Sequence, residues 1–166
     1  MIGDRWGVTL PETQRWYPCD DVVPDPVLEA WRGVTVLAPP ERLWPWVAQI
    51  RLAPYSYDWI DNLGRRSPQR LCGLPDPVVG EPFTTALGGR PLGRIVAVNA
   101  GEHLTAKIMG AVMSYVLVPD GSTTRLLLKV VMRQTRVAPL VSLGDFVMAR
   151  RQLLNLARLA AQGGSV

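Results

Sequence analysis

A long amphipathic segment at the end of the chain constrains the fold more than any other feature. Residues 142–162 predict a helix that Ser142 caps, with Asp145 in a first turn where the helix dipole favours negative charge. Its apolar stripe consists of Phe146, Ala149, Leu153, Leu156 and Ala160, widened by Val147, Leu154, Ala157 and Ala161. The side expected to face solvent carries Arg151, Gln152, Asn155 and Arg158. A stripe this wide needs a broad apolar surface to pack against.

Short β-prone runs between residues 78 and 135 supply such a surface. The runs are residues 78–79, 83–87, 92–98, 104–109, 112–118 and 125–135. Turn signals separate them, the clearest being residues 119–122, Pro-Asp-Gly-Ser. Successive hairpins of this kind predict an antiparallel meander. In the last run, the face expected to point inward carries Leu126, Leu128, Val130 and Met132. The face expected to lie mostly in solvent carries Arg125, Lys129 and Arg133, with Leu127 and Val131.

The segment before this meander combines one strand with two short helices. Residues 31–38 predict a strand that Pro39 and Pro40 end, and residues 40–50 show helical spacing of apolar side chains. Residues 57–63 predict a second short helix that ends at Gly64. A sheet that begins this way leaves room for a ligand cavity between itself and the terminal helix.

The expected organisation is one α+β domain with an N-terminal arm. Its 166 residues fit one domain of ordinary size, and 48% apolar with 19% charged residues is a globular composition. Residues 1–29 show no sustained period, although Trp6, Trp16 and Tyr17 indicate that this arm packs on the domain of residues 30–166.

Charge and cysteine usage limit the function classes. The net charge is +4, and the basic residues are scattered, with one local cluster at residues 65–70, so we expect no nucleic-acid partner. Cys19 and Cys72 have no CxxC partner, so the sequence contains no zinc pattern and we expect no metal site. We also expect no cofactor. Two free thiols are the plainer interpretation, and a disulfide between them stays open. Without a signal peptide or an apolar run of about 20 residues, we expect a cytoplasmic protein with no integral membrane association.

The order of strand, two helices, six strands and long C-terminal helix is a helix-grip layout. Together with "APPERLWPWVAQ" at 38–49, "YSYDWIDNL" at 55–63 and "LPDPVVGEPF" at 74–83, it resembles the SRPBCC superfamily, the START-like and polyketide-cyclase-like group. The chain looks most similar to the uncharacterised actinobacterial branch. The resemblance implies a curved antiparallel sheet of six or seven strands wrapped around the long C-terminal helix, with a hydrophobic pocket between them.

The resemblance also implies the partner, a small hydrophobic molecule that is lipid-, sterol- or polyketide-like. Some members cyclise or dehydrate polyketides, and the superfamily has no universal catalytic motif. Three function hypotheses therefore stand open. They are a binding protein, a polyketide cyclase or dehydratase that uses the same cavity, and a non-catalytic interaction or stress module with a vestigial cavity. Whether the chain is a monomer or a homodimer also stays open.

Three residues, His103, Asp58 and Tyr115, are candidates for catalysis. His103 is the sole histidine and the one side chain with an ordinary pKa near neutrality, so it is either an edge histidine or a general base at the cavity mouth. Asp58 and Asp61 share one helix face, either as a cap with a solvated charge or as an acid–base pair. Tyr115, on a central strand, is placed to donate a hydrogen bond inside the cavity.

The ligand contacts are expected to come from aromatic and methionine side chains. Aromatic rings offer flat apolar faces, and methionine adapts to varied shapes, although both also fill ordinary cores. The predicted ligand-binding residues are Tyr55, Tyr57, Trp59, Met109, Met113, Tyr115, Met132 and Phe146.

Overall fold

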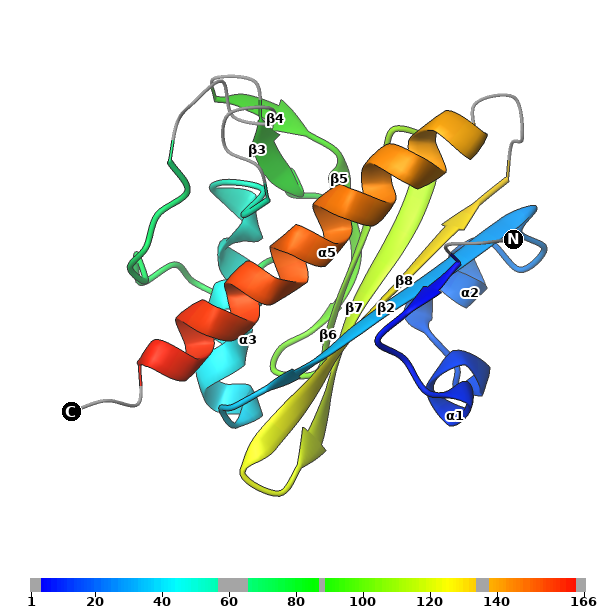
Figure 1. Ribbon diagram of the computed structural model, residues 1–166. Helices are drawn as coiled ribbons and strands as arrows, with labels where there is room; N and C mark the ends of the chain where they lie inside the picture. Colours follow the sequence, from blue (N-terminus) through cyan, green and yellow to red (C-terminus); the bar gives the residue numbers. More distant parts are fainter. Residues whose placement is uncertain (1–3, 57–65, 87–88, 134–137, 164–166) are drawn as a thin grey trace.

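One curved sheet and a long helix lying diagonally across it dominate the molecule (Figure 1). This computed structural model describes residues 4–56, 66–86, 89–133 and 138–163, with the backbone alone at 86 and 138–147. The six strands of the sheet follow the order β1-β2-β8-β7-β6-β5. Their bounds are Arg5–Trp6 (β1), Leu28–Val36 (β2), Arg94–Asn99 (β5), His103–Ile108 (β6), Ala111–Asp120 (β7) and Thr123–Met132 (β8). A separate two-stranded ribbon consists of Thr84–Ala86 (β3) and Arg90–Leu92 (β4).

The predicted meander is confirmed from β5 to β8. Strands β5, β6, β7 and β8 pair in chain order, and each pair is antiparallel. The turn predicted at residues 119–122 closes the β7–β8 hairpin, in which Asp120 pairs with Thr123. Strand β2 then pairs antiparallel with β8, and β1 adds a short parallel pair, so the sheet is mixed. Residues 78–79, predicted as a strand, form a loop.

Helices cover the concave face of the sheet. Helix α3 (Pro40–Ala48) follows β2 directly and continues into a 3₁₀ turn, Gln49–Arg51. Helix α5 (Ala138–Gln162) starts before the predicted Ser142, with Pro139 in its first turn, where the missing N–H costs nothing. It contacts β2, β8 and α3. The second helix, predicted at residues 57–63, lies outside the described residues.

The inward face of β8 was predicted correctly. The four side chains expected to point inward belong to one large core with the fully buried Leu153 and Leu156 of α5. The prediction that Leu154 widens the apolar stripe is wrong, because its side chain is 43% exposed. The nearby Leu159 is buried instead.

The prediction for the other face of β8 is wrong, because the N-terminal segment covers it. Two short helices, α1 (Leu10–Gln14) and α2 (Pro18–Val22), lie on this face, opposite α5 (Figure 1). The segment around α2 completes a second apolar cluster in which Leu127 and Val131 are fully buried. The other members of this outer core are Tyr17, Cys19, Val23, Trp31, Val112 and Val116. Residues 18–22 belong to the stretch without a sustained period, yet they form a helix with Pro18 in its first turn.

Ion pairs attach the covering segment to the sheet. Lys129, 5% exposed, binds Asp20 at 2.6 Å and Glu29 at 2.8 Å. Arg125 binds both carboxylate oxygens of Glu12, at 2.7 and 2.9 Å. The hydrogen bond from Arg125 is the main reason that the pKa of Glu12 is lowered. Two of the three basic side chains expected in solvent, Arg125 and Lys129, therefore bind carboxylates more than 90 positions away in the chain, while Arg133 is exposed as expected.

The edge of the sheet at β5 is partly covered by the loop before β3. The Gly80 amide donates to the Ile95 carbonyl, and the Ile95 amide donates to the Glu81 carbonyl, both at 2.9 Å. A register shift between Ile95 and Ala97 then interrupts the pairing of β5 with β6.

Candidate functional site

Two polar side chains meet inside the apolar core between the sheet and α5. The Tyr115 hydroxyl, on β7, donates to Gln152 Oε1, on α5, at 2.6 Å. Gln152 Nε2 in turn donates to the Pro54 carbonyl at 2.6 Å. Tyr115 is 1% and Gln152 8% exposed, so this hydrogen-bonded pair is removed from water. Because buried polar groups are costly without partners, the pair fixes the position of α5 relative to β7.

A second set of buried hydrogen bonds lies beside the first. Gln49 Nε2 donates to the Tyr55 hydroxyl at 2.6 Å, and that hydroxyl donates to the Pro68 carbonyl at 2.8 Å. Asn155 Nδ2, on α5, donates to the Tyr55 carbonyl at 2.9 Å. Tyr55 has a φ of 56°, in the left-handed region that costs a side chain about 1–3 kcal/mol. These bonds offset that cost and attach residues 54–56 to the helix.

The surroundings of the Tyr115–Gln152 pair are apolar. The Phe83 ring lies 6.0 Å from the Tyr115 ring, centroid to centroid, and Met113 Sδ lies 3.5 Å from the Tyr115 hydroxyl. The hydrogen-bonding groups of both sets are uncharged. Such an arrangement, a few fixed polar groups among aromatic and aliphatic side chains, is typical of sites for apolar ligands with one polar group.

Four of the predicted ligand-binding residues lie together in the large core, on the side of the sheet that faces α5. Tyr55, Met113, Tyr115 and Met132 are all buried members of the large core. Met109 does not join them, because it lies in the β6–β7 turn with φ 48° and 81% of its surface exposed. The other three predicted residues stay predictions, because Tyr57, Trp59 and the Phe146 side chain lie outside the described residues.

The two catalytic candidates that the structure describes lie on opposite faces of the sheet. Tyr115 points into the core, as expected for a central strand. His103 lies at the start of β6 opposite Val116, on the face that the N-terminal segment covers, so the whole sheet separates it from α5. Asp58 lies outside the described residues. Of the described candidates, Tyr115 alone reaches the inner side of the sheet.

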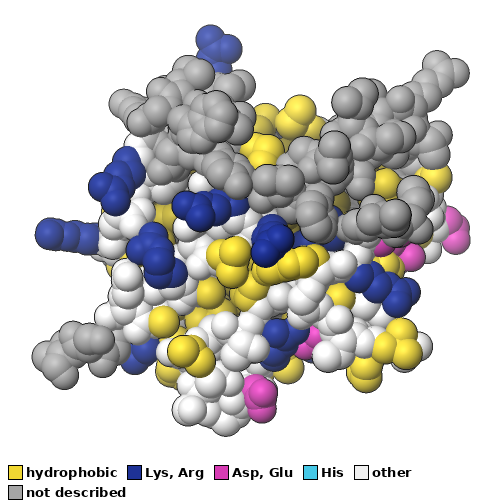
Figure 2. Space-filling model, in the orientation of Figure 1, with side chains coloured by type: hydrophobic (Ala, Val, Ile, Leu, Met, Phe, Trp, Pro, Cys, Tyr) yellow, Lys and Arg dark blue, Asp and Glu magenta, His cyan; other side chains and the backbone are white. Residues whose placement is uncertain are grey.

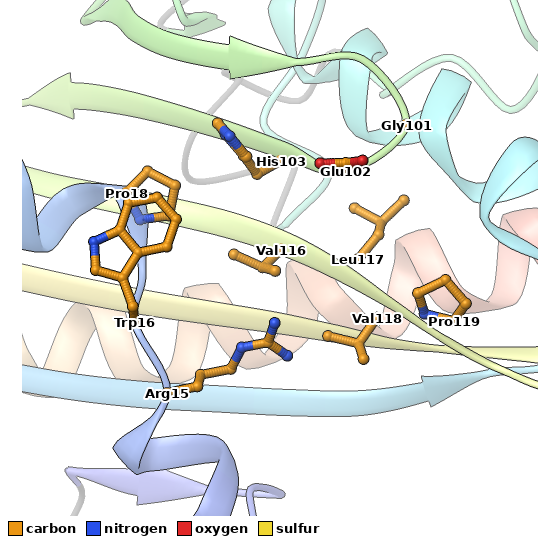
Figure 3. Close-up of a pocket in the computed structure, with 10 residues that line it drawn as sticks. All are labelled: Arg15, Trp16, Pro18, Gly101, Glu102, His103, Val116, Leu117, Val118 and Pro119. Carbon is orange, nitrogen blue, oxygen red and sulfur yellow. The ribbon is translucent and has the colours of Figure 1, made fainter.

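His103 borders a pocket on the outer face (Figure 3). The pocket has a volume of about 310 Å³ and lies between residues 15–18 and the strands β6 and β7. Figure 3 shows the Arg15 guanidinium extending toward Val118, while the Trp16 ring stands beside Pro18. The lining residues are Arg15, Trp16, Pro18, Gly101, Glu102, His103, Val116, Leu117, Val118 and Pro119.

Burial sets the charge of His103. Desolvation lowers its pKa, and the Glu102 carboxylate opposes that shift only in part. The imidazole is therefore neutral at pH 7. Its buried Nδ1 has no hydrogen-bond partner among the described residues.

Gln152 and Asn155 are the interior residues that sequence reasoning missed. Both were expected on the solvent side of the helix, because they flank the apolar stripe and are polar. The loop of residues 53–56 covers that flank and supplies backbone carbonyls as their acceptors. Helical periodicity contains no signal for a covering loop about 100 positions away.

Charge on the α5 side is distributed, not clustered. Figure 2 shows Lys and Arg side chains across this view, separated by apolar and neutral atoms. Among the described residues, no group of three or more His, Cys, Asp or Glu side chains is placed to hold a metal ion. Both cysteines are free, Cys19 buried and Cys72 exposed. In the described part of the chain, no helix has the length and apolarity to cross a bilayer.

Comparisons with known proteins establish the fold. A scan against protein-family models finds no match, and no curated protein matches the sequence. Solved structures do match. A Mesorhizobium loti protein aligns with 83% of this chain and 99% of its own at 17% identity and a TM-score of 0.58. An Arthrobacter aurescens protein aligns with 82% and 88% at 12% identity and a TM-score of 0.54.

A third neighbour carries a family description. The AHSA1-like protein from Aeromonas hydrophila aligns with 81% of this chain and 94% of its own, at 16% identity and a TM-score of 0.50. At these identities the likeness concerns the fold alone. The chain therefore has the α+β helix-grip fold of AHSA1-like proteins, with a curved sheet packed on its C-terminal helix.

Proposed function

We propose that the protein binds a small hydrophobic molecule with one hydrogen-bonding group, between the concave face of the sheet and α5. The observation that carries the proposal is the buried Tyr115–Gln152 hydrogen bond within an otherwise apolar region. The Tyr115 hydroxyl and the Gln152 amide together offer donors and an acceptor. A ligand hydroxyl that enters between the two side chains can accept from the Tyr115 hydroxyl and donate to Gln152 Oε1. Every group of the buried pair then stays hydrogen-bonded, so binding carries little desolvation cost.

The proposal also specifies a class of ligand and a branch of the family. A lipid-, sterol- or polyketide-like molecule fits the proposal, because the described interior is aliphatic and aromatic with uncharged hydrogen-bonding groups around Tyr115. The motifs at residues 38–49 and 55–63 support a place in the actinobacterial branch of the SRPBCC superfamily. We keep a cytoplasmic location as part of the proposal.

A polyketide cyclase or dehydratase is the second candidate. It is favoured by the Tyr115 hydroxyl, which is a proton donor fixed at the inner side of the sheet. His103 is not available for this chemistry, because it lies on the opposite face. Catalysis would then depend mainly on holding the substrate in a folded conformation.

Native mass spectrometry of freshly purified protein tests the proposal. We expect a hydrophobic adduct that is lost on denaturation. Tyr115→Phe removes only the hydroxyl, and we expect adduct occupancy to fall about fivefold or more, which corresponds to one hydrogen bond of about 1 kcal/mol. Gln152→Leu, which removes the other member of the pair, should have the same effect.

Tyr17→Phe is the matched control, because it removes the same atom from the outer core, where the Tyr17 hydroxyl donates to the Glu12 carbonyl. It should leave the adduct unchanged. A protein that remains free of adduct after incubation with a cellular lipid extract would instead support the module with a vestigial cavity. Full occupancy in Tyr115→Phe would show that the buried pair does not recognise the ligand.

A further inference from the structure

We propose that the outer pocket is a second ligand site, specific for a small flat carboxylate. It is separate from the interior, because it lies on the face of the sheet that α1 and α2 cover. Arg15, Trp16 and His103 line the outer pocket and take no part in the interior site. The interior proposal therefore does not depend on this one.

Shape favours a flat, mostly apolar body. A volume of about 310 Å³ lies at the small end of ligand pockets. The Trp16 ring and Pro18 form one side, and Val116 and Val118 lie on the adjoining strand β7 (Figure 3). An aromatic ring system fits beside an indole because both present flat apolar faces.

The segment that carries Arg15 and Trp16 is held in place before any ligand arrives. The Cys19 amide donates to Ser114 Oγ on β7 at 2.9 Å, and Asp20 pairs with Lys129. Trp16 Nε1 donates to Asp21 Oδ1 at 3.1 Å, which orients the indole. A pocket fixed in this way loses little conformational entropy on binding.

Charge selects a carboxylate. Arg15 makes no ion pair and no hydrogen bond with any residue that the structure describes, although its guanidinium lines the pocket. A guanidinium binds a carboxylate with two parallel hydrogen bonds. Glu102 lines the pocket near His103, held by Asn99 Nδ2 at 2.6 Å, and repels a second negative group at that position. One carboxylate on a flat body therefore matches the pocket better than a dianion.

The sole histidine provides a clean test. Because the chain has one His, the imidazole NMR signals report this pocket without ambiguity. With 2-naphthoate as the probe, we expect saturable shifts of the His103 signals and a matching heat of binding. The neutral analogue 2-naphthamide should bind about fivefold or more weakly, because it loses the charge-assisted bonds.

Variants locate the contacts. Arg15→Gln should weaken 2-naphthoate binding to the level of the amide, and Trp16→Ala should weaken both probes. Arg94→Gln is the matched control, because Arg94 is exposed at the end of β5 distant from His103 and should leave binding unchanged. No saturable His103 shift, equal affinity for the two probes, or full affinity in Arg15→Gln would each overturn the proposal. Stronger binding of 2-naphthylmethylamine than of 2-naphthoate would do so too, since it would make Glu102 the selecting group.

Discussion

His103 illustrates how position changes the meaning of a residue type. As the sole histidine it was a candidate general base, yet it lies across the sheet from the Tyr115–Gln152 pair. Parity along β6 contained this information, because His103 alternates with Leu104, which packs in the large core. What parity could not show was the partial burial of the imidazole, since the covering residues come from the N-terminal segment.

The burial of His103 predicts a measurable pH dependence. Since desolvation lowers its pKa in the folded state, we expect an NMR titration midpoint below about 6.5. The unfolded state then binds the proton more readily, so the free energy of unfolding falls as pH drops through this region. His103→Gln should reduce the difference in unfolding free energy between about pH 7.5 and pH 5.5. A midpoint above that of an unfolded peptide would contradict this assignment.

At the scale of elements, the N-terminal segment is the part that sequence patterns described least well. Alternation along β8 identified the inner face correctly, because apolar side chains occupy every second position from 126 to 132. On the other face, Lys129 and Arg125 alternate with Leu127 and Val131, a mixture that favours partial exposure. Their partners Asp20 and Glu12 lie in a segment without periodicity. Its aromatic residues indicate that it packs on the domain, but no local pattern indicates which face it covers.

Gly7 is a position where this segment lies too close to the sheet for a side chain. It has φ 67°, and a Cβ added there would lie 2.1 Å from the Gly33 carbonyl oxygen on β2. We therefore expect Gly7→Ala to lower the free energy of unfolding in urea by at least about 2 kcal/mol, from strain plus a backbone clash. Gly121→Ala is the control. Gly121 has a similar φ of 61° and open space around it, so strain alone of about 1 kcal/mol should remain.

Cys19 reports the opening of the same segment. Its thiol is fully buried, and burial raises its pKa to about 11, whereas Cys72 is exposed. In Gly7→Ala, labelling of Cys19 by a thiol reagent should accelerate while labelling of Cys72 stays unchanged. Equal losses of stability in the two glycine variants, with Cys19 still protected, would mean that the Gly7–Gly33 approach is not what holds the segment.

For the whole molecule, the contact between α5 and the sheet encloses the larger of the two described hydrophobic cores. The sequence predicted this contact, because the apolar stripe of the helix and the meander each need the other. The set of helix residues in this contact was not predictable, because Leu154 is exposed and Leu159 is buried. Which flank of the stripe becomes buried depends on where the loop of residues 53–56 crosses the helix.

Two neighbouring leucines of α5 test which side of the helix is buried. Leu153 is fully buried and Leu154 is 43% exposed, so the same truncation removes different contacts. Leu153→Ala should lower the free energy of unfolding by about 2–5 kcal/mol, whereas Leu154→Ala should cost about 1 kcal/mol or less. Thermal and urea unfolding by circular dichroism measure both. Similar losses in the two variants would show that the helix does not pack in this orientation.

The partly covered strand β5 affects how the molecule can associate. Unpaired strand edges are the usual route by which sheets of separate chains join. Here the Gly80 and Glu81 backbone already bonds to Ile95, and the shift in register beside it bends the strand out of line. A continuous ladder of hydrogen bonds between two copies is therefore blocked at this place. Should this chain form a homodimer at this edge, its subunits would have to meet there through side-chain surfaces, leaving each sheet complete in itself.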